Sequence, residues 1–185
     1  MEPFRVVVAD PPWKYKDGMW QRPQSKATNH YSTLSLAEIC ALPVEQFMAD
    51  DAYLFLWTTN RKLVEGWSNE VATAWGFRAL TFMVWIKPWM GLGNYFRNCH
   101  ENVVLGVRGS PGQFKYKNWK SWFMTDQNLG HSAKPVELID AIETHTDGPY
   151  LELFAREGRP GWTSWGQGVG DPLNVGFDPS RWGCE

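Results

Sequence analysis

The sequence has few cysteines, no long apolar run and no excess of positive charge, and each absence narrows the class of protein. Its three cysteines are an odd number without the paired spacing of a zinc site, which argues against a disulfide framework and a structural metal. No apolar stretch reaches the roughly 20 residues that a membrane-spanning helix needs, and no secretory signal stands at the start. We therefore expect a cytoplasmic protein that binds no metal.

The charges of the chain nearly balance, with 18 Lys+Arg against 20 Asp+Glu and a formal net charge of -2. Such a chain is not a polycation that coats nucleic acid, so any polyanion must be held by a local basic patch. Tryptophan is plentiful at 12 residues. Rings in this number either fill a core or offer stacking surfaces for bases.

The length of 185 residues suits one domain, 1–185, whose tail after about residue 168 we expect to be irregular. Apolar runs predict strands at Phe4–Ala9, Ala52–Thr58, Leu80–Ile86, Asn102–Val107 and Tyr150–Ala155. Helical spacing predicts helices at Ser35–Ala41, Asn60–Trp75 and Pro135–His145. This alternation predicts an α/β fold in a single layered domain with a mainly parallel sheet, and no periodic element after Arg156.

The segment Asp10-Pro11-Pro12-Trp13 follows the first expected strand, where α/β sheets place their chemistry. Its residue types suit a grip on a planar exocyclic amine, whose delocalised lone pair makes it a poor nucleophile. The Asp10 carboxylate can accept one N–H and a carbonyl of the Pro-Pro pair the other, and Trp13 offers a ring to the base. In the competing interpretation, the prolines belong to an ordinary loop after a strand and Trp13 caps the core.

Further segments extend this pattern over almost the whole chain. They are HYSTLSLAEI at His30–Ile39, LFLWT at Leu54–Thr58, WGF and WIK at Trp75–Phe77 and Trp85–Lys87, GLGNYFRNCHENVVLGVRG from Gly91 to Gly109, HSAKP at His131–Pro135, YLELFAR at Tyr150–Arg156 and GWTSWG at Gly161–Gly166. In this order, and with ADPPW at Ala9–Trp13, they resemble the permuted, class beta N6-adenine methyltransferases. That family includes catalytic subunits of eukaryotic mRNA adenosine methyltransferases and many phage and bacterial DNA methylases.

The resemblance implies a Rossmann-like methyltransferase fold with circularly permuted motif order, in which the catalytic strand comes first and the cofactor strand near the end. It implies catalytic roles for Asp10, Pro11, Pro12 and Trp13. It also implies that S-adenosyl-L-methionine is the cofactor, with contacts from Asp10, Lys134, Phe154, Arg156 and Gln167. At Gln167 the family usually has Asn, and Gln167-Gly168 replaces the family's Asn-Glu. An acidic stretch upstream of the catalytic strand, present in larger members, has no counterpart here.

The expected substrate side is assembled from scattered residues. By resemblance, Tyr31 lies in a loop that folds over the site, and Glu101, together with Arg97 and Asn98, lines it; a surface tyrosine and a surface ion pair of Glu101 with Lys134 are the alternatives. The segment 114–122 interleaves lysines and aromatics as a phosphate-binding and base-stacking patch would. Its candidates are Lys115, Lys117, Trp119 and Lys120, against the alternative of a strand with a solvated lysine face.

We therefore predict methyl transfer from S-adenosylmethionine to the N6 amine of adenine in DNA. The same reaction on RNA is the nearest alternative, and a catalytically inactive nucleic-acid-binding subunit is another, against which the intact Asp10–Trp13 motif weighs. We expect no obligatory different protein partner and no membrane association. A homodimer is left open, because symmetric dimers are the commonest oligomers.

Overall fold

The computed structural model describes residues 2–14, 33–91, 95–125, 133–167 and 169–173. Within them one seven-stranded sheet has the order β5-β3-β4-β2-β1-β6-β7. The strands are β1 Phe4–Ala9, β2 Met48–Thr58, β3 Arg78–Ile86, β4 His100–Arg108, β5 Trp122–Met124, β6 Tyr150–Leu153 and β7 Trp162–Trp165. Four of the six neighbouring pairs are parallel, and only β4 runs antiparallel to its neighbours β2 and β3. This is a mixed, mostly parallel α/β sheet, as the sequence predicts.

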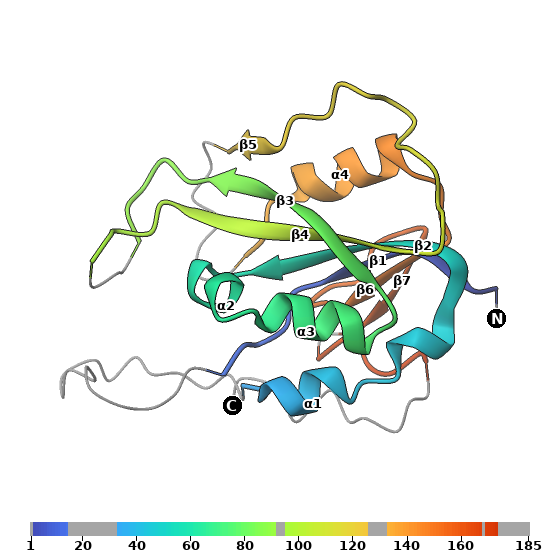
Figure 1. Cartoon of the computed structure of the whole chain (residues 1–185). Coiled ribbons are helices and arrows are strands. Elements are labelled where there is room, and N and C mark those ends of the chain that lie inside the picture. The colour runs from blue at the N-terminus through green and yellow to red at the C-terminus, as the bar shows by residue number, and fades with distance from the viewer. Residues whose placement is uncertain (1, 15–32, 92–94, 126–132, 168, 174–185) are drawn as a thin grey trace.

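Helices cover both faces of the sheet (Figure 1). They are α1 Leu36–Cys40, the 3-10 helix η1 Val44–Phe47, α2 Asn60–Val64, α3 Trp67–Ala74 and α4 Val136–His145. Helices α1 and α3 pack on one face through Ile39 and Val71, and α4 packs on the other through Leu138 and Ile142. The central strands are thus buried on both sides, which explains why β1 is apolar from Val6 to Ala9 and β2 is apolar from Ala52 to Trp57.

The alternation of side chains along β1 decides where the polar residue after it points. Val6 and Val8 belong to the core under α4, whereas Val7 and Ala9 belong to the core under α1 and α3. Because successive side chains alternate between faces, Asp10 continues the row of Val6 and Val8. The carboxyl end of β1 therefore presents Asp10 at the edge of the sheet, toward the segment that enters α4.

The structure corrects two of the predicted elements. The helix expected from Asn60 to Trp75 is two helices, because Gly66 adopts a left-handed φ of 80° between α2 and α3, and the N-cap is Thr59 rather than Asn60. Strand β7 lies in the region after Arg156 where no element was expected. Four residues between turns are too few for an apolar period to be visible.

Two helices of this layer have well-defined ends. Ser35 and Glu38 form a capping box at the start of α1: the Glu38 backbone N–H donates to Ser35 Oγ, and the Ser35 N–H donates to Glu38 Oε2 at 2.8 Å. Gly76 ends the α3 region with a φ of 80°. No helix in the described parts of the chain is long and apolar enough to cross a membrane.

Candidate active site

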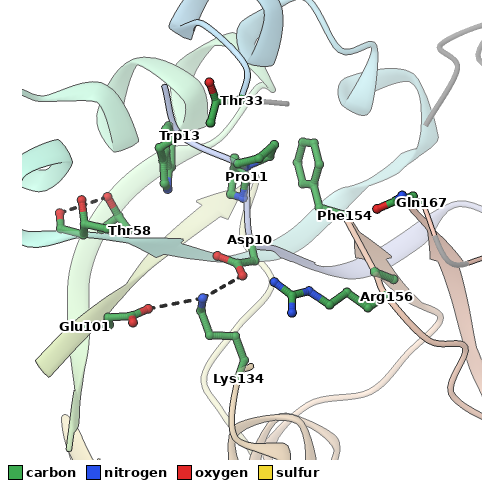
Figure 2. Close-up of a pocket in the computed structure, with 13 residues that line it drawn as sticks. Asp10, Pro11, Trp13, Thr33, Thr58, Glu101, Lys134, Phe154, Arg156 and Gln167 are labelled. Carbon is green, nitrogen blue, oxygen red and sulfur yellow. Dashed lines mark hydrogen bonds and ion pairs between the residues drawn. The ribbon is translucent and has the colours of Figure 1, made fainter. Parts of the chain in front are cut away.

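A cavity of about 270 Å³ opens at the carboxyl ends of β1, β2 and β6, and we call it the edge cavity. Figure 2 shows side chains from distant parts of the chain converging on it, with Asp10 near the middle. Its lining residues are Asp10, Pro11, Pro12, Trp13, Thr33, Thr58, Thr59, Glu101, Lys134, Phe154, Ala155, Arg156 and Gln167. A second cavity, the helix cavity of about 420 Å³, adjoins α4 and shares Asp10, Lys134, Phe154 and Arg156 with the first.

The turn after β1 is held by backbone hydrogen bonds on both sides. The Trp13 N–H donates to the Pro11 carbonyl at 2.8 Å, and the Leu34 N–H donates to the Pro12 carbonyl at 2.8 Å. Each carbonyl oxygen has two lone pairs, so each can still accept a second hydrogen bond. The two prolines have a fixed φ and no N–H donors, which leaves this turn rich in acceptors.

Trp13 is mostly a structural member of this turn. Its side chain is buried in the core, its indole N–H donates to the Trp57 carbonyl at 3.2 Å, and its ring meets that of Trp67 edge-on at 6.3 Å. The ring also lines the edge cavity. Trp13 thus anchors the Pro-Pro turn to β2, and only a small part of its surface faces the cavity.

Four charged side chains form a chain of ion pairs along the cavity, and we call them the charge cluster: Asp10, Lys134, Glu101 and Lys87. Lys134 Nζ lies 2.7 Å from Asp10 Oδ2 and 3.3 Å from Glu101 Oε2 (Figure 2). Lys87 forms a further ion pair with Glu101 Oε1. The formal charges sum to zero, which allows the cluster to persist in a partly buried place.

The charge cluster lowers the pKa of its carboxylate Glu101 and raises the pKa of its ammonium Lys134. Burial favours the neutral form of Glu101, but Lys134 and Lys87 outweigh it and lower the pKa of Glu101. Burial likewise disfavours the charged form of Lys134, but the charges of Asp10 and Glu101 outweigh it and raise the pKa of Lys134. Both groups are therefore charged at neutral pH.

The opposite wall of the edge cavity comes from the end of β6. Phe154 has a φ of 65° although it is not glycine, a conformation that costs roughly 1–2 kcal/mol. It is held there by close backbone packing: the Ala155 N–H donates to the Trp165 carbonyl at 3.0 Å, and a Cβ on Gly166 would lie 2.1 Å from the Ala155 oxygen. This backbone directs the Phe154 ring and the Arg156 side chain into the cavity (Figure 2).

Most of the chain matches a known protein family. The MT-A70 family model matches residues 4–168. The chain belongs to the MT-A70 family. The match includes every described element from β1 to β7.

Named MT-A70 relatives are similar over nine-tenths of this chain. The human N(6)-adenine-specific methyltransferase METTL4 is 32% identical over 90% of the chain and the Mycoplasma type II methyltransferase M.MunI is 31% identical over 91%. The human N(6)-adenosine-methyltransferase catalytic subunit METTL3 is 29% identical over 88%. The chain spans 37% of the length of METTL4, 28% of METTL3 and 78% of M.MunI.

The two cavities fit the chemistry of S-adenosylmethionine, the cofactor that the MT-A70 resemblance implies. That molecule has an amino-acid end with an ammonium and a carboxylate, a sulfonium cation, a ribose and a flat adenine. The cavities offer carboxylates at Asp10 and Glu152, cations at Lys134 and Arg156, and an aromatic face at Phe154. The charges and the aromatic ring on the cavity walls are thus compatible with this cofactor.

The structure brings together most of the residues that the sequence predicts for the site. Asp10, Pro11, Pro12, Trp13, Glu101, Lys134, Phe154, Arg156 and Gln167 all line the edge cavity. The pairing of Glu101 with Lys134 is present, and it is one link of a larger cluster rather than an isolated surface pair. Tyr31 lies outside the residues that the structure describes.

The candidate basic patch 114–122 lies away from this cavity. The Lys115 N–H donates to the His145 carbonyl at 2.9 Å and its ammonium pairs with Asp147 at 2.5 Å, so it sits before β6, at the amino-terminal edge of the parallel strands. From there the segment passes over α4 to β5 (Figure 1). Trp119 stacks on His145 at 4.3 Å. Lys117 and Lys120 are exposed, and none of the segment's residues lines either cavity.

Sequence reasoning gave no role to Lys87 or Glu152. Lys87 belongs to the WIK segment, and its signal was a lone cation at the end of an apolar strand. Glu152 is the central polar residue of YLELFAR and lines the helix cavity, where burial and the nearby charge of Asp10 raise its pKa, although Arg159 opposes them. A carboxylate in the middle of a buried parallel strand was the available signal.

Proposed function

We propose that this chain transfers a methyl group from S-adenosylmethionine to the N6 amine of adenine. The observation that carries the proposal is the position of Asp10, which lies between the two cavities beside an acceptor-rich turn. The methyl donor can then lie on the β6 side of Asp10, and the target base on the side of the Pro-Pro turn. The MT-A70 membership and the names of METTL4 and METTL3 support the same reaction.

In this proposal the side chains act mainly by orientation. When bound, the cofactor would supply an electrophilic methyl on sulfur: the N6–CH₃ bond would form as the S–CH₃ bond breaks, and the positive charge would pass from sulfur to nitrogen. Asp10 uses Oδ2 for Lys134, which leaves Oδ1 to accept one N6–H. The Pro11 or Pro12 carbonyl accepts the other N6–H, so the nitrogen lone pair is directed at the methyl group.

Such alignment accounts for much of the expected rate, because orientation of two reactants is worth roughly 7–11 kcal/mol. The extra proton on nitrogen leaves after transfer, to water or through Asp10. Lys134 holds the Asp10 carboxylate in place through their ion pair while Asp10 accepts the amine hydrogen. Phe154, Arg156, Glu152 and Gln167 are assigned to the cofactor, whose carboxylate suits Arg156 and whose ribose hydroxyls suit the carboxylate and amide oxygens.

We further propose that the nucleic acid is DNA. The chain covers 78% of M.MunI, whereas it covers little more than a quarter of METTL3. The matched region therefore makes up most of M.MunI, a type II methyltransferase, but only a minor part of METTL3. A flipped or single-stranded adenine is the form that a cavity at a sheet edge can admit.

The test is mass spectrometry of nucleosides from matched DNA and RNA oligonucleotides incubated with the protein and isotope-labelled cofactor. We expect labelled N6-methyladenine from DNA without any second polypeptide. Asp10→Ala should lower turnover by at least about two orders of magnitude, the scale of losing one preorganised hydrogen-bond partner, with the melting curve showing a folded protein. Near-normal activity of the folded variant would exclude the role of Asp10, and activity on RNA alone would exclude the choice of DNA.

A further inference from the structure

The connection between β3 and β4 presents two bulky rings to solvent beside the edge cavity. Tyr95 is 98% exposed and Phe96 is 87% exposed, and Arg97 next to them is also exposed. Leaving adjacent aromatic rings in water forgoes the free energy that burial of each would give. Exposure of this degree in two neighbouring residues indicates a surface whose partner is another molecule.

The described parts of this connection are anchored at their base. The Lys87 N–H donates to the Cys99 carbonyl at 2.7 Å, and the Gly91 N–H donates to the Asn98 carbonyl at 2.8 Å. A Cβ on Gly91 would lie 2.8 Å from the Asn98 oxygen, so the two strands of the connection approach closely there. The Asn60 side-chain amide donates to Asn98 Oδ1 at 3.3 Å and ties the connection to α2. The two rings therefore project from a connection whose base is fixed by hydrogen bonds.

The connection leaves the sheet at the same edge as the cavity. His100 pairs with Ile86 at the end of β3, and Asn102 pairs with Thr58 at the end of β2. Glu101, between them, lines the edge cavity. Since Phe96 is five residues from Glu101, a chain of this length keeps the Phe96 Cα within about 17 Å of the Glu101 Cα. Figure 1 shows the connection extending past the end of β2 on this side of the molecule.

We propose that Tyr95 and Phe96 stack on bases of the nucleic-acid strand beside the target adenine, with Arg97 at a backbone phosphate. The proposal rests on the proposed function, because the strand it describes is the one that delivers adenine to the edge cavity. Nucleic acid is chosen as the partner because the surface of Tyr95, Phe96 and Arg97 is continuous with that cavity. Its chemistry also fits, since the two rings suit base faces and the cation suits the phosphate. The stacking accepts any base and does not read sequence.

The experiment measures binding of a single-stranded DNA oligonucleotide of about 12 nucleotides, within the usual span of such sites, by fluorescence anisotropy. The double variant Tyr95→Ala/Phe96→Ala should raise the oligonucleotide Kd at least about tenfold, the effect expected from losing stacking contacts. The Kd for S-adenosylmethionine and the melting temperature should stay unchanged. The matched control Tyr95→Phe/Phe96→Tyr keeps both rings and should keep the affinity.

The outcomes separate this proposal from the proposed function. An unchanged oligonucleotide Kd in the alanine double variant overturns the stacking role. Loss of self-association in ultracentrifugation with an unchanged Kd also overturns it and assigns the rings to contact between copies. If the wild-type protein methylates no nucleic acid, the proposed function fails, while the anisotropy measurement still decides whether these rings hold the strand.

Discussion

The charge cluster makes Lys134→Met the most informative single substitution for stability. Lys134 touches two carboxylates at 2.7 and 3.3 Å, and its side chain is 19% exposed. Methionine keeps much of the apolar length of the lysine stem, so the change removes mainly the charge. Without it, the charge cluster keeps the two carboxylates of Asp10 and Glu101 and the single ammonium of Lys87.

The expected cost follows from the geometry. Each contact has a gross attraction of roughly 5–6 kcal/mol at an effective dielectric of 20, most of which offsets the cost of removing the charges from water. Removal of one partner from a buried pair costs about 3–5 kcal/mol, and the partial exposure here favours the lower end, about 3 kcal/mol. In a domain of this size that corresponds to a fall in Tm of roughly 6–12 °C.

The stability that Lys134→Met loses should depend on pH. The pKa of Glu101 is lowered by the cluster, so its stabilisation is complete above the ordinary glutamate pKa and disappears as the pH falls through the lowered value. The pKa of Lys134 is raised, so its contribution is lost only as the pH rises through that raised value. The Tm difference between wild type and Lys134→Met should therefore be constant between about pH 6 and 9 and shrink in acid.

Calorimetry over this pH range checks the prediction, with Lys117→Met as the control because Lys117 is an exposed lysine outside both cavities. A loss below about 1 kcal/mol at neutral pH, the scale of an ordinary surface pair, would refute the reasoning. So would a Tm difference that persists unchanged when Glu101 is protonated.

Three further predictions test other parts of the site. Lys87→Met should raise the pKa of Glu101, which that lysine lowers, and shift the acid limb of the kcat/KM profile to higher pH, with Lys87→Arg restoring it; an unmoved limb would show a merely structural role. Gly166→Ala should destabilise the fold by about 1–3 kcal/mol and weaken cofactor binding in calorimetry, because the new Cβ meets the Ala155 backbone. The triple change of Lys115, Lys117 and Lys120 to Ala should flatten the salt dependence of DNA binding if that segment contacts phosphates, and an unaltered slope would make it a solvated face.

The strands that carry the site were predictable because they are buried on both faces. A continuous apolar run such as Phe4–Ala9 has the same appearance in every parallel sheet, so its end and the polar residue after it could be located from the sequence. The convergence of Asp10, Lys134 and Glu101 was anticipated partly from the family pattern. Their mutual distances depend on strand order, which no local pattern contains.

The parts that escaped prediction are decided by tertiary contacts. Trp13 reads in sequence as a ring for a base, but its indole N–H and ring find partners on β2 and α3. Lys115 belongs to a promising basic run, yet a single ion pair with Asp147 places it at the far edge of the sheet. The four-residue strand β7 is defined by its pairing with β6, which the local sequence does not predict.

The central place of β1 has a consequence for how the protein comes to be active. One edge of β1 pairs with β2. The other edge pairs with β6, which is synthesised some 140 residues later. Until then, a strand that is apolar from Val6 to Ala9 has an open edge, the feature that favours pairing with other chains. Asp10 meets Lys134 and Phe154 only after that edge closes, so a ribosome-bound chain cannot assemble the cavity before β6 and β7 emerge. We expect newly synthesised chains to depend on chaperones during this interval, and to acquire cofactor binding in one late step.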